Sequence, residues 1–130
     1  MKRFLLLALM LGLMPVGQIS AEEAPQPQYV YRAEITRVVA GDSVELNPDL
    51  GFGVWVHGQT LKLLDVDAPD INGPQQEAAL LKKGRLAELL KDRAEIVVQT
   101  VKDKKAKPAR YLVTIWADGV NVNEEMKKPK

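Results

Sequence analysis

After residue 28, short stretches of alternating apolar and polar residues recur along the chain, separated by glycine, proline and aspartate. This period of two predicts β-strands. Gly41-Asp42 and Asp118-Gly119 separate neighbouring stretches and predict tight turns. Residues 47–53, which contain Pro48, predict a longer turn. Strands are expected over residues 29–39, 43–46, 54–57, 60–66, 95–101, 111–116 and 120–122.

One segment has a helical period instead. Residues 75–91 are strong helix formers, and Pro74 stands where it suits the first helical turn. Four apolar side chains share one face at a spacing of 3.6 residues: Ala79, Leu86, Leu89 and Leu90. Gly84 interrupts this helix at a cost of about 1 kcal/mol relative to alanine. Asn123 is expected to cap a second, short helix.

A few short strands with one helix inserted before the last of them suggest a small Greek-key barrel. The five-stranded OB-fold has this outline, and a half-open sandwich fits the pattern nearly as well. We predict a mainly β (α+β) domain over residues 29–126, followed by a basic tail at 127–130. Its expected architecture is a five-stranded OB-fold barrel with one inserted helix and a truncated C-terminal helix.

The first 21 residues have the layout of a secretory signal. Lys2 and Arg3 are followed by an apolar run over residues 4–14, and Ala21 offers a small residue for cleavage. An uncleaved anchor is the alternative, but the run is short of the ~20 residues that span a bilayer. We predict cleavage after Ala21, a flexible lead-in at 22–28, and a periplasmic or secreted domain that is not membrane-bound.

The charge and the cysteine content limit how this chain can bind nucleic acid and how its fold can be stabilised. The formal net charge is only +1, whereas nucleic-acid binders usually carry a basic excess. Attraction to phosphate must therefore come from a local cluster. The best candidates for substrate binding are Lys102, Lys104, Lys105 and Lys107. The chain has no cysteine, so no disulfide can stabilise the domain and its core must do so alone.

Three aspartates, Asp42, Asp67 and Asp70, stand where predicted strands end. If the fold brings Asp42 and Asp67 together, their carboxylates suit a hard cation such as calcium, which can polarise a phosphate. Lys62 and Arg110 could then clamp phosphate oxygens, and Asp70 could orient or deprotonate a water. The plainer alternatives are turn aspartates that bond their own backbone and solvated surface cations.

The order of these motifs resembles the staphylococcal nuclease (thermonuclease) family. The resemblance covers about residues 35–126. It implies an OB-fold barrel and a calcium-dependent nuclease that cleaves DNA and RNA. We further predict a monomer that favours single-stranded substrate. The matching segments are ITRVVAGDSVEL (35–46), LKLLDVDAPD (61–70), NGPQQEA (72–78), ARYLVTIWADG (109–119) and VNE (122–124).

The resemblance assigns a single calcium ion to Asp42 and Asp67, which match the two metal carboxylates of the family. The backbone carbonyl of Ala68 falls where the family supplies a third oxygen. Ala68 stands in place of a threonine, and Ala40 in place of a further acidic residue.

The catalytic set departs further from the family. Arg110 matches one catalytic arginine, but Lys62 replaces the other and Asp70 replaces the catalytic glutamate. Lysine loses the two-pronged phosphate contact of arginine. Aspartate is one methylene shorter, and a misplacement of about 1 Å can cost on the order of 100-fold in rate. The sequence therefore predicts an exported, slow nuclease. The alternatives are a catalytically impaired barrel that binds nucleic acid or a protein partner, and a purely structural envelope protein.

Overall fold

The computed structural model describes residues 22–105 and 110–129, so the predicted leader at 1–21 lies outside the described residues. The elements in chain order are β1 (Val30–Ala40), β2 (Ser43–Gly51), β3 (Val54–Trp55), β4 (Gln59–Leu63), α2 (Gln76–Leu90), β5 (Ile96–Lys102), β6 (Tyr111–Ala117), β7 (Val120–Asn121) and α3 (Val122–Lys127). None of the helices in these two ranges is long and apolar enough to cross a membrane.

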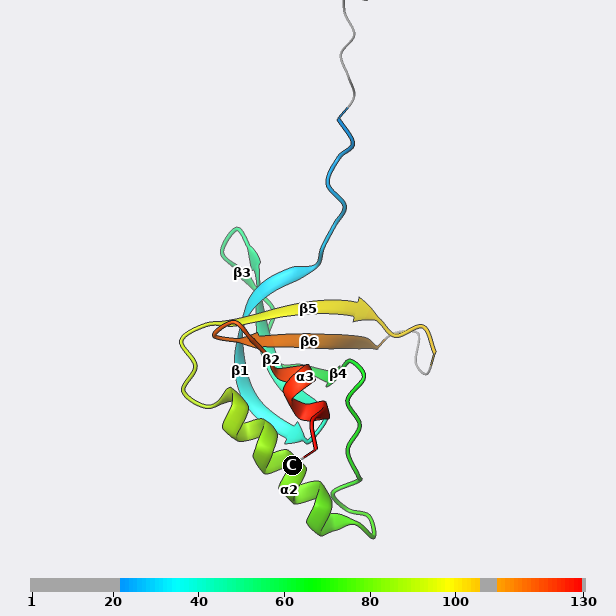
Figure 1. The fold of residues 1–130 in the computed structure, drawn as a ribbon. Helices are drawn as coiled ribbons and strands as arrows, with labels where there is room; N and C mark the ends of the chain where they lie inside the picture. Colours follow the sequence, from blue (N-terminus) through cyan, green and yellow to red (C-terminus); the bar gives the residue numbers. More distant parts are fainter. Residues whose placement is uncertain (1–21, 106–109, 130) are drawn as a thin grey trace, which may run out of the picture.

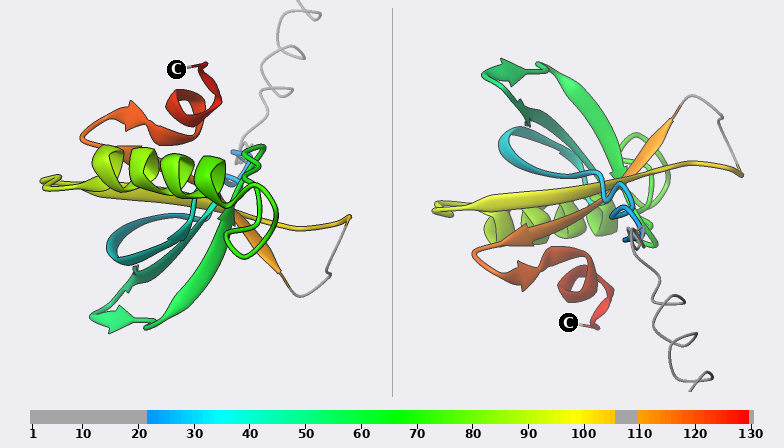
Figure 2. Two further views of the ribbon diagram at one scale, coloured as in Figure 1. Left: turned by 90° about the horizontal axis from the view of Figure 1, so that it is seen from below. Right: turned by 90° about the horizontal axis from the view of Figure 1, so that it is seen from above.

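Five strands close into a barrel in the order β1-β5-β6-β4-β2, and β2 pairs back onto β1 (Figure 1). The short strand β3 extends β2 as a hairpin that projects from the barrel, and β7 is added to β6 (Figure 2). Most neighbours are antiparallel, whereas β4 and β6 are parallel. The protein is therefore mainly β, with the OB-like barrel and inserted helix that the strand pattern predicts.

The core fills the barrel with the inward-facing side chains of its strands. Val44, Leu46, Val98, Val113 and Ile115 are completely buried there. Each such side chain contributes about 1.5–3 kcal/mol through burial. Alternation of buried and partly buried positions in β2 and β6 follows the pleat of the strands.

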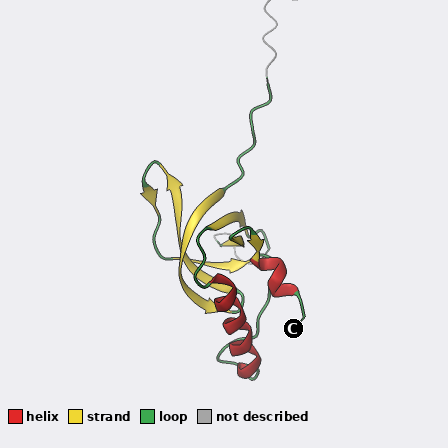
Figure 3. Cartoon of the chain, turned by 60° about the vertical axis from the view of Figure 1, so that its left-hand side comes forward, coloured by secondary structure: helices red, strands yellow, loops and turns green. Residues whose placement is uncertain are grey.

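Both helices lie on the same side of the barrel (Figure 3). The predicted apolar face of α2 is confirmed, because Ala79, Leu86 and Leu90 are buried and Leu89 packs against the core. Arg85 joins the two helices. Its guanidinium donates hydrogen bonds to the carbonyls of Glu125 (2.6 Å) and Lys128 (2.7 Å) at the end of α3.

Several boundaries differ from the sequence prediction, and the strands predicted at 54–57 and 120–122 end early, at Trp55 and Asn121. Residues 47–53 are not a turn, because β2 continues to Gly51 and pairs with β1 as far as Asp49. The turn is shorter and is centred on Phe52, which has a left-handed φ of 57°. Pro74 precedes α2 instead of standing in its first turn, since the helix begins at Gln76. The strand predicted for residues 60–66 ends at Leu63.

The predicted cap of the last helix is also wrong. Asn121, not Asn123, caps α3, and its side chain accepts a hydrogen bond from the backbone N–H of Glu124 at 3.1 Å. Asn123 lies inside the helix and is only 2% exposed. Its amide makes three hydrogen bonds to backbone groups, with Ile115 N–H (3.0 Å), Val113 C=O (2.9 Å) and Leu64 C=O (3.1 Å). Asn123 therefore fastens α3 to β6 and to the chain that leaves β4.

Candidate functional site

The turn between β1 and β2 places Asp42 beside the chain that leaves β4. The backbone carbonyl of Asp42 accepts a hydrogen bond from Leu63 N–H at 2.8 Å. Its carboxylate accepts one from the backbone N–H of Ala68 at 3.3 Å and one from the Ser43 hydroxyl at 3.2 Å. The fold thus brings Asp42 to the Asp67–Ala68 peptide, two segments that are separated by more than twenty residues in the sequence.

Two lysines contact Asp67 from different elements. Lys62, on β4, holds its ammonium 3.1 Å from the Asp67 carboxylate and donates to the Val66 carbonyl at 2.7 Å. Lys82, on α2, donates to the backbone carbonyl of Asp67. The sequence analysis placed Lys82 only beside the apolar face of its helix and missed this contact. One ammonium therefore lies beside the carboxylate that was predicted to bind the metal, and a second lies at the backbone carbonyl of the same residue.

Gly41 allows this close approach of the hairpin and α2. A Cβ atom at this buried position would lie 2.8 Å from Lys82 Cγ and 3.0 Å from Ala68 Cβ, which is too close for either contact. A side chain at position 41 would therefore displace Lys82 or the hairpin.

Replacing Gly41 with alanine is expected to lower the free energy of unfolding by about 1 to 3 kcal/mol, because overpacking strains the contact with Lys82. Gly84 provides the matched control, since a Cβ there meets no atom within 4 Å. Alanine at Gly84 should instead stabilise α2 by up to about 1 kcal/mol. Urea denaturation of both variants measures the difference. An unchanged stability in the Gly41 variant would show that the hairpin can move away at no cost.

Asp70 forms its hydrogen bonds within a local turn. It is exposed, and its carboxylate accepts a hydrogen bond from Asn72 N–H at 2.9 Å. Its carbonyl accepts another from Gly73 N–H at 3.0 Å. The hydrogen bonds of Asp70 are those of an aspartate that closes its own turn ahead of α2.

Arg110 is held by a carboxylate that the sequence analysis missed. Its guanidinium donates two hydrogen bonds to Asp103, at 2.6 and 2.9 Å. Asp103 is only 5% exposed, and its backbone N–H donates to the Arg110 carbonyl at 2.9 Å. The pair fastens the two ends of the connection between β5 and β6. Its only sequence signal is an acidic residue inside a run of lysines.

The predicted substrate-binding lysines belong to the same connection. Lys102, Lys104 and Lys105 are exposed, and the backbone N–H of Lys105 donates to the Asp103 carboxylate at 3.0 Å. Lys107 lies outside the described residues.

These residues do not fit a resident calcium ion as they are arranged. Calcium takes six to eight oxygen ligands, and no group of three or more acidic, histidine or cysteine side chains that could hold a metal occurs in residues 22–105 and 110–129. Ala40 and Ala68 add no side-chain oxygen. The ammonium of Lys62 lies 3.1 Å from the Asp67 carboxylate, whose side chain is 92% exposed, so a divalent cation there would compete with a solvent-screened ion pair.

The fold defines the class of this protein as a small OB-like barrel with an ion-paired aspartate cluster at one hairpin. No protein-family model matches the chain, and no curated protein is significantly similar to it. Any relationship to the staphylococcal nuclease family therefore rests on the ordered motifs.

Proposed function

We propose that this protein is a catalytically impaired barrel of the staphylococcal nuclease type that binds single-stranded nucleic acid. The ion pair between Lys62 and Asp67 carries the proposal, because it places an ammonium where the chemistry of the family needs a metal ion. The pairing of Arg110 with Asp103 adds support. A guanidinium that donates its Nε and one terminal nitrogen to a buried carboxylate has fewer donors left for a phosphate.

The nucleic-acid contact is assigned to the connection between β5 and β6. Lys102, Lys104 and Lys105 expose their side chains there, so phosphates can approach without displacing other groups. The overall charge is near neutral, and attraction must therefore be local and sensitive to salt. Export through the predicted leader, a periplasmic or extracellular location and a monomeric state belong to the same proposal.

A slow calcium-dependent nuclease is the second candidate. It is favoured by the contact between the Asp42 carboxylate and the backbone of Ala68, which brings the two predicted metal segments together. Calcium would have to compete with the Lys62 ammonium for the Asp67 carboxylate at this site.

Incubation of denatured DNA with the chain beginning at Glu22, in calcium or in chelator, separates the two candidates. We expect the same negligible degradation in both conditions. Asp67→Asn is the test variant, and Asp65→Asn, at an exposed aspartate two residues earlier, is the control. Calcium-dependent cleavage that disappears only in the Asp67 variant would overturn the impaired barrel and establish the nuclease.

Calcium is also expected to leave the melting temperature of the unaltered protein within about 1 °C of its value in chelator. Replacing Lys62 and Lys82 together with glutamine removes the two competing ammonium groups, so calcium should then stabilise the fold. At a concentration about tenfold above the Kd the stabilisation would be about 1.4 kcal/mol. Thermal melts with and without calcium test this, and magnesium serves as the ion control. Equal stabilisation of both proteins would contradict the proposed role of the lysines.

A further inference from the structure

One end of the barrel is open at the seam between β4 and β6. These two strands pair at only two positions, Lys62 with Leu112 and Leu63 with Val113. The earlier residues of β4, Gln59 to Leu61, pair with β2 on their other side but have no register partner in β6. Inward-facing side chains at this end therefore border a space that no strand closes.

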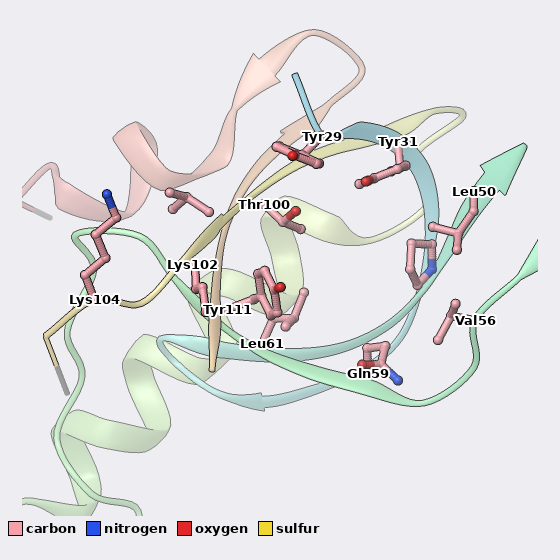
Figure 4. Close-up of a pocket in the computed structure, with 12 residues that line it drawn as sticks. Tyr29, Tyr31, Leu50, Val56, Gln59, Leu61, Thr100, Lys102, Lys104 and Tyr111 are labelled. Atoms are coloured by element: carbon pink, nitrogen blue, oxygen red, sulfur yellow. The ribbon is translucent and has the colours of Figure 1, made fainter. Parts of the chain in front are cut away.

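A pocket of about 630 Å³ occupies this opening (Figure 4). Its size falls within the range of small-molecule sites. All three tyrosines of the chain line it: Tyr29, Tyr31 and Tyr111. Tyr29 and Tyr31 lie on one side of the opening, with Tyr111 and Leu61 across from them, and Lys104 stands beyond one end. The pocket therefore combines aromatic walls with a cationic edge.

The side chains indicate a planar ligand that carries negative charge. Tyrosine rings offer flat faces for stacking, and stacking on an aromatic ring is worth roughly 1–3 kcal/mol per nucleobase. The amide of Gln59 and the hydroxyl of Thr100 also line the pocket and can bond to the edge of a ring. Lys102 and Lys104 supply positive charge at the rim. An apolar pocket alone would suit an acyl chain, but the grouping of every tyrosine with two lysines favours a nucleotide.

The residues that line the pocket do not include Asp42, Asp67 or Asp70. Tyr31 lies near the start of β1, whereas Asp42 follows its end, and the β-strand between them has 11 residues.

We propose that the barrel mouth binds one base of a single-stranded nucleic acid, stacked among the tyrosines, while Lys102 and Lys104 bind its adjoining phosphates. This inference rests on the proposed nucleic-acid binding and adds a base subsite to it. Lys102 and Lys104 line the same pocket as the tyrosines. The nucleic-acid strand therefore enters the pocket from the connection between β5 and β6.

The test compares a fluorescent oligothymidylate with an abasic deoxyribose-phosphate strand of the same length. Fluorescence anisotropy with the chain beginning at Glu22 is expected to show about tenfold tighter binding of the strand with bases. Tyr31→Leu and Tyr111→Leu keep an apolar side chain but remove the stacking face, and should abolish most of that difference. Phe52→Leu is the matched control, because Phe52 is fully exposed on the β2–β3 hairpin and does not line the pocket.

Equal affinity for the two strands, unchanged in the tyrosine variants, would overturn the base subsite and leave phosphate binding intact. Failure to bind either strand would overturn the proposed function as well. Thymidine monophosphate titrated into the unaltered protein gives an NMR readout that does not depend on how the variants fold. Shifts at the amides of Gln59 and Thr100 are expected. Shifts elsewhere alone, or shifts at these amides with decanoate and not with the nucleotide, would overturn the inference.

Discussion

Replacing Asn123 with alanine is expected to lower the free energy of unfolding by roughly 3 to 5 kcal/mol. The substitution leaves the N–H of Ile115 and the carbonyls of Val113 and Leu64 without their side-chain partner. Each buried polar group that loses its hydrogen bond costs about 1–3 kcal/mol. The Val113 carbonyl keeps the hydrogen bond it accepts from Leu64 N–H at 2.8 Å, so the loss falls mainly on the other two groups. A total of this size is exceptional for one substitution. It follows from the position of Asn123 between α3, β6 and the end of β4.

Asn121 supplies the matched control for this prediction. It has the same side chain and lies two residues away, but it only caps α3. Alanine at an N-cap typically costs about 1 kcal/mol. Urea denaturation followed by circular dichroism should therefore separate the two variants clearly. Similar losses at the two positions would show that Asn123 contributes no more than a helix cap.

Replacing Asp103 with alanine is expected to cost roughly 2 to 3 kcal/mol of stability. Removing one partner of a buried ion pair commonly costs 3–5 kcal/mol. The expected value is lower here because the Arg110 side chain is 32% exposed and can be solvated once it is released. The backbone N–H of Lys105 would also lose its acceptor. Urea denaturation checks the loss, and alanine at Glu88, an exposed residue of α2, should change stability by less than about 0.5 kcal/mol.

Replacing Asp103 with alanine is also expected to change nucleic-acid binding. Release of Arg110 and loss of a negative charge should tighten binding of the abasic strand several-fold and steepen its dependence on salt by about one phosphate contact. Anisotropy titrations at several salt concentrations measure this. A weaker affinity in a variant that is still folded would mean that Asp103 positions the connection for binding, not that it withholds Arg110 from phosphate.

The sequence predicted the architecture because strand period and helix period are local properties. Residues 47–53 were misassigned since Pro48 and the glycines favour a turn, whereas pairing with β1 extends the strand to Gly51. The cap was misassigned because Asn121 and Asn123 both precede acidic residues in a short helix. Only the contact of Asn123 with β6 distinguishes them, and that contact joins residues remote from the local pattern.

The candidate site, like the fold, could be predicted from the sequence only in part. The order of motifs correctly suggested that Asp42 and the Asp67–Ala68 segment meet. The contact of Lys82 with Asp67 depends on where α2 packs against the hairpin, which helix propensity does not encode. The ion-pair partner of Arg110 could not be predicted from the sequence, for a different reason. Asp103 lies among lysines in the sequence, and only the folded connection buries it.

The parallel pairing of β4 with β6 also determines when the barrel can form during synthesis. β1, β2 and β4 are complete at Leu63, but the apolar face they share is covered only after β6 ends at Ala117. At translation rates of about 5–20 residues per second this interval lasts a few seconds. The nascent chain therefore passes through a stage in which Val44 and Leu46 lack their final partners and are available to chaperones.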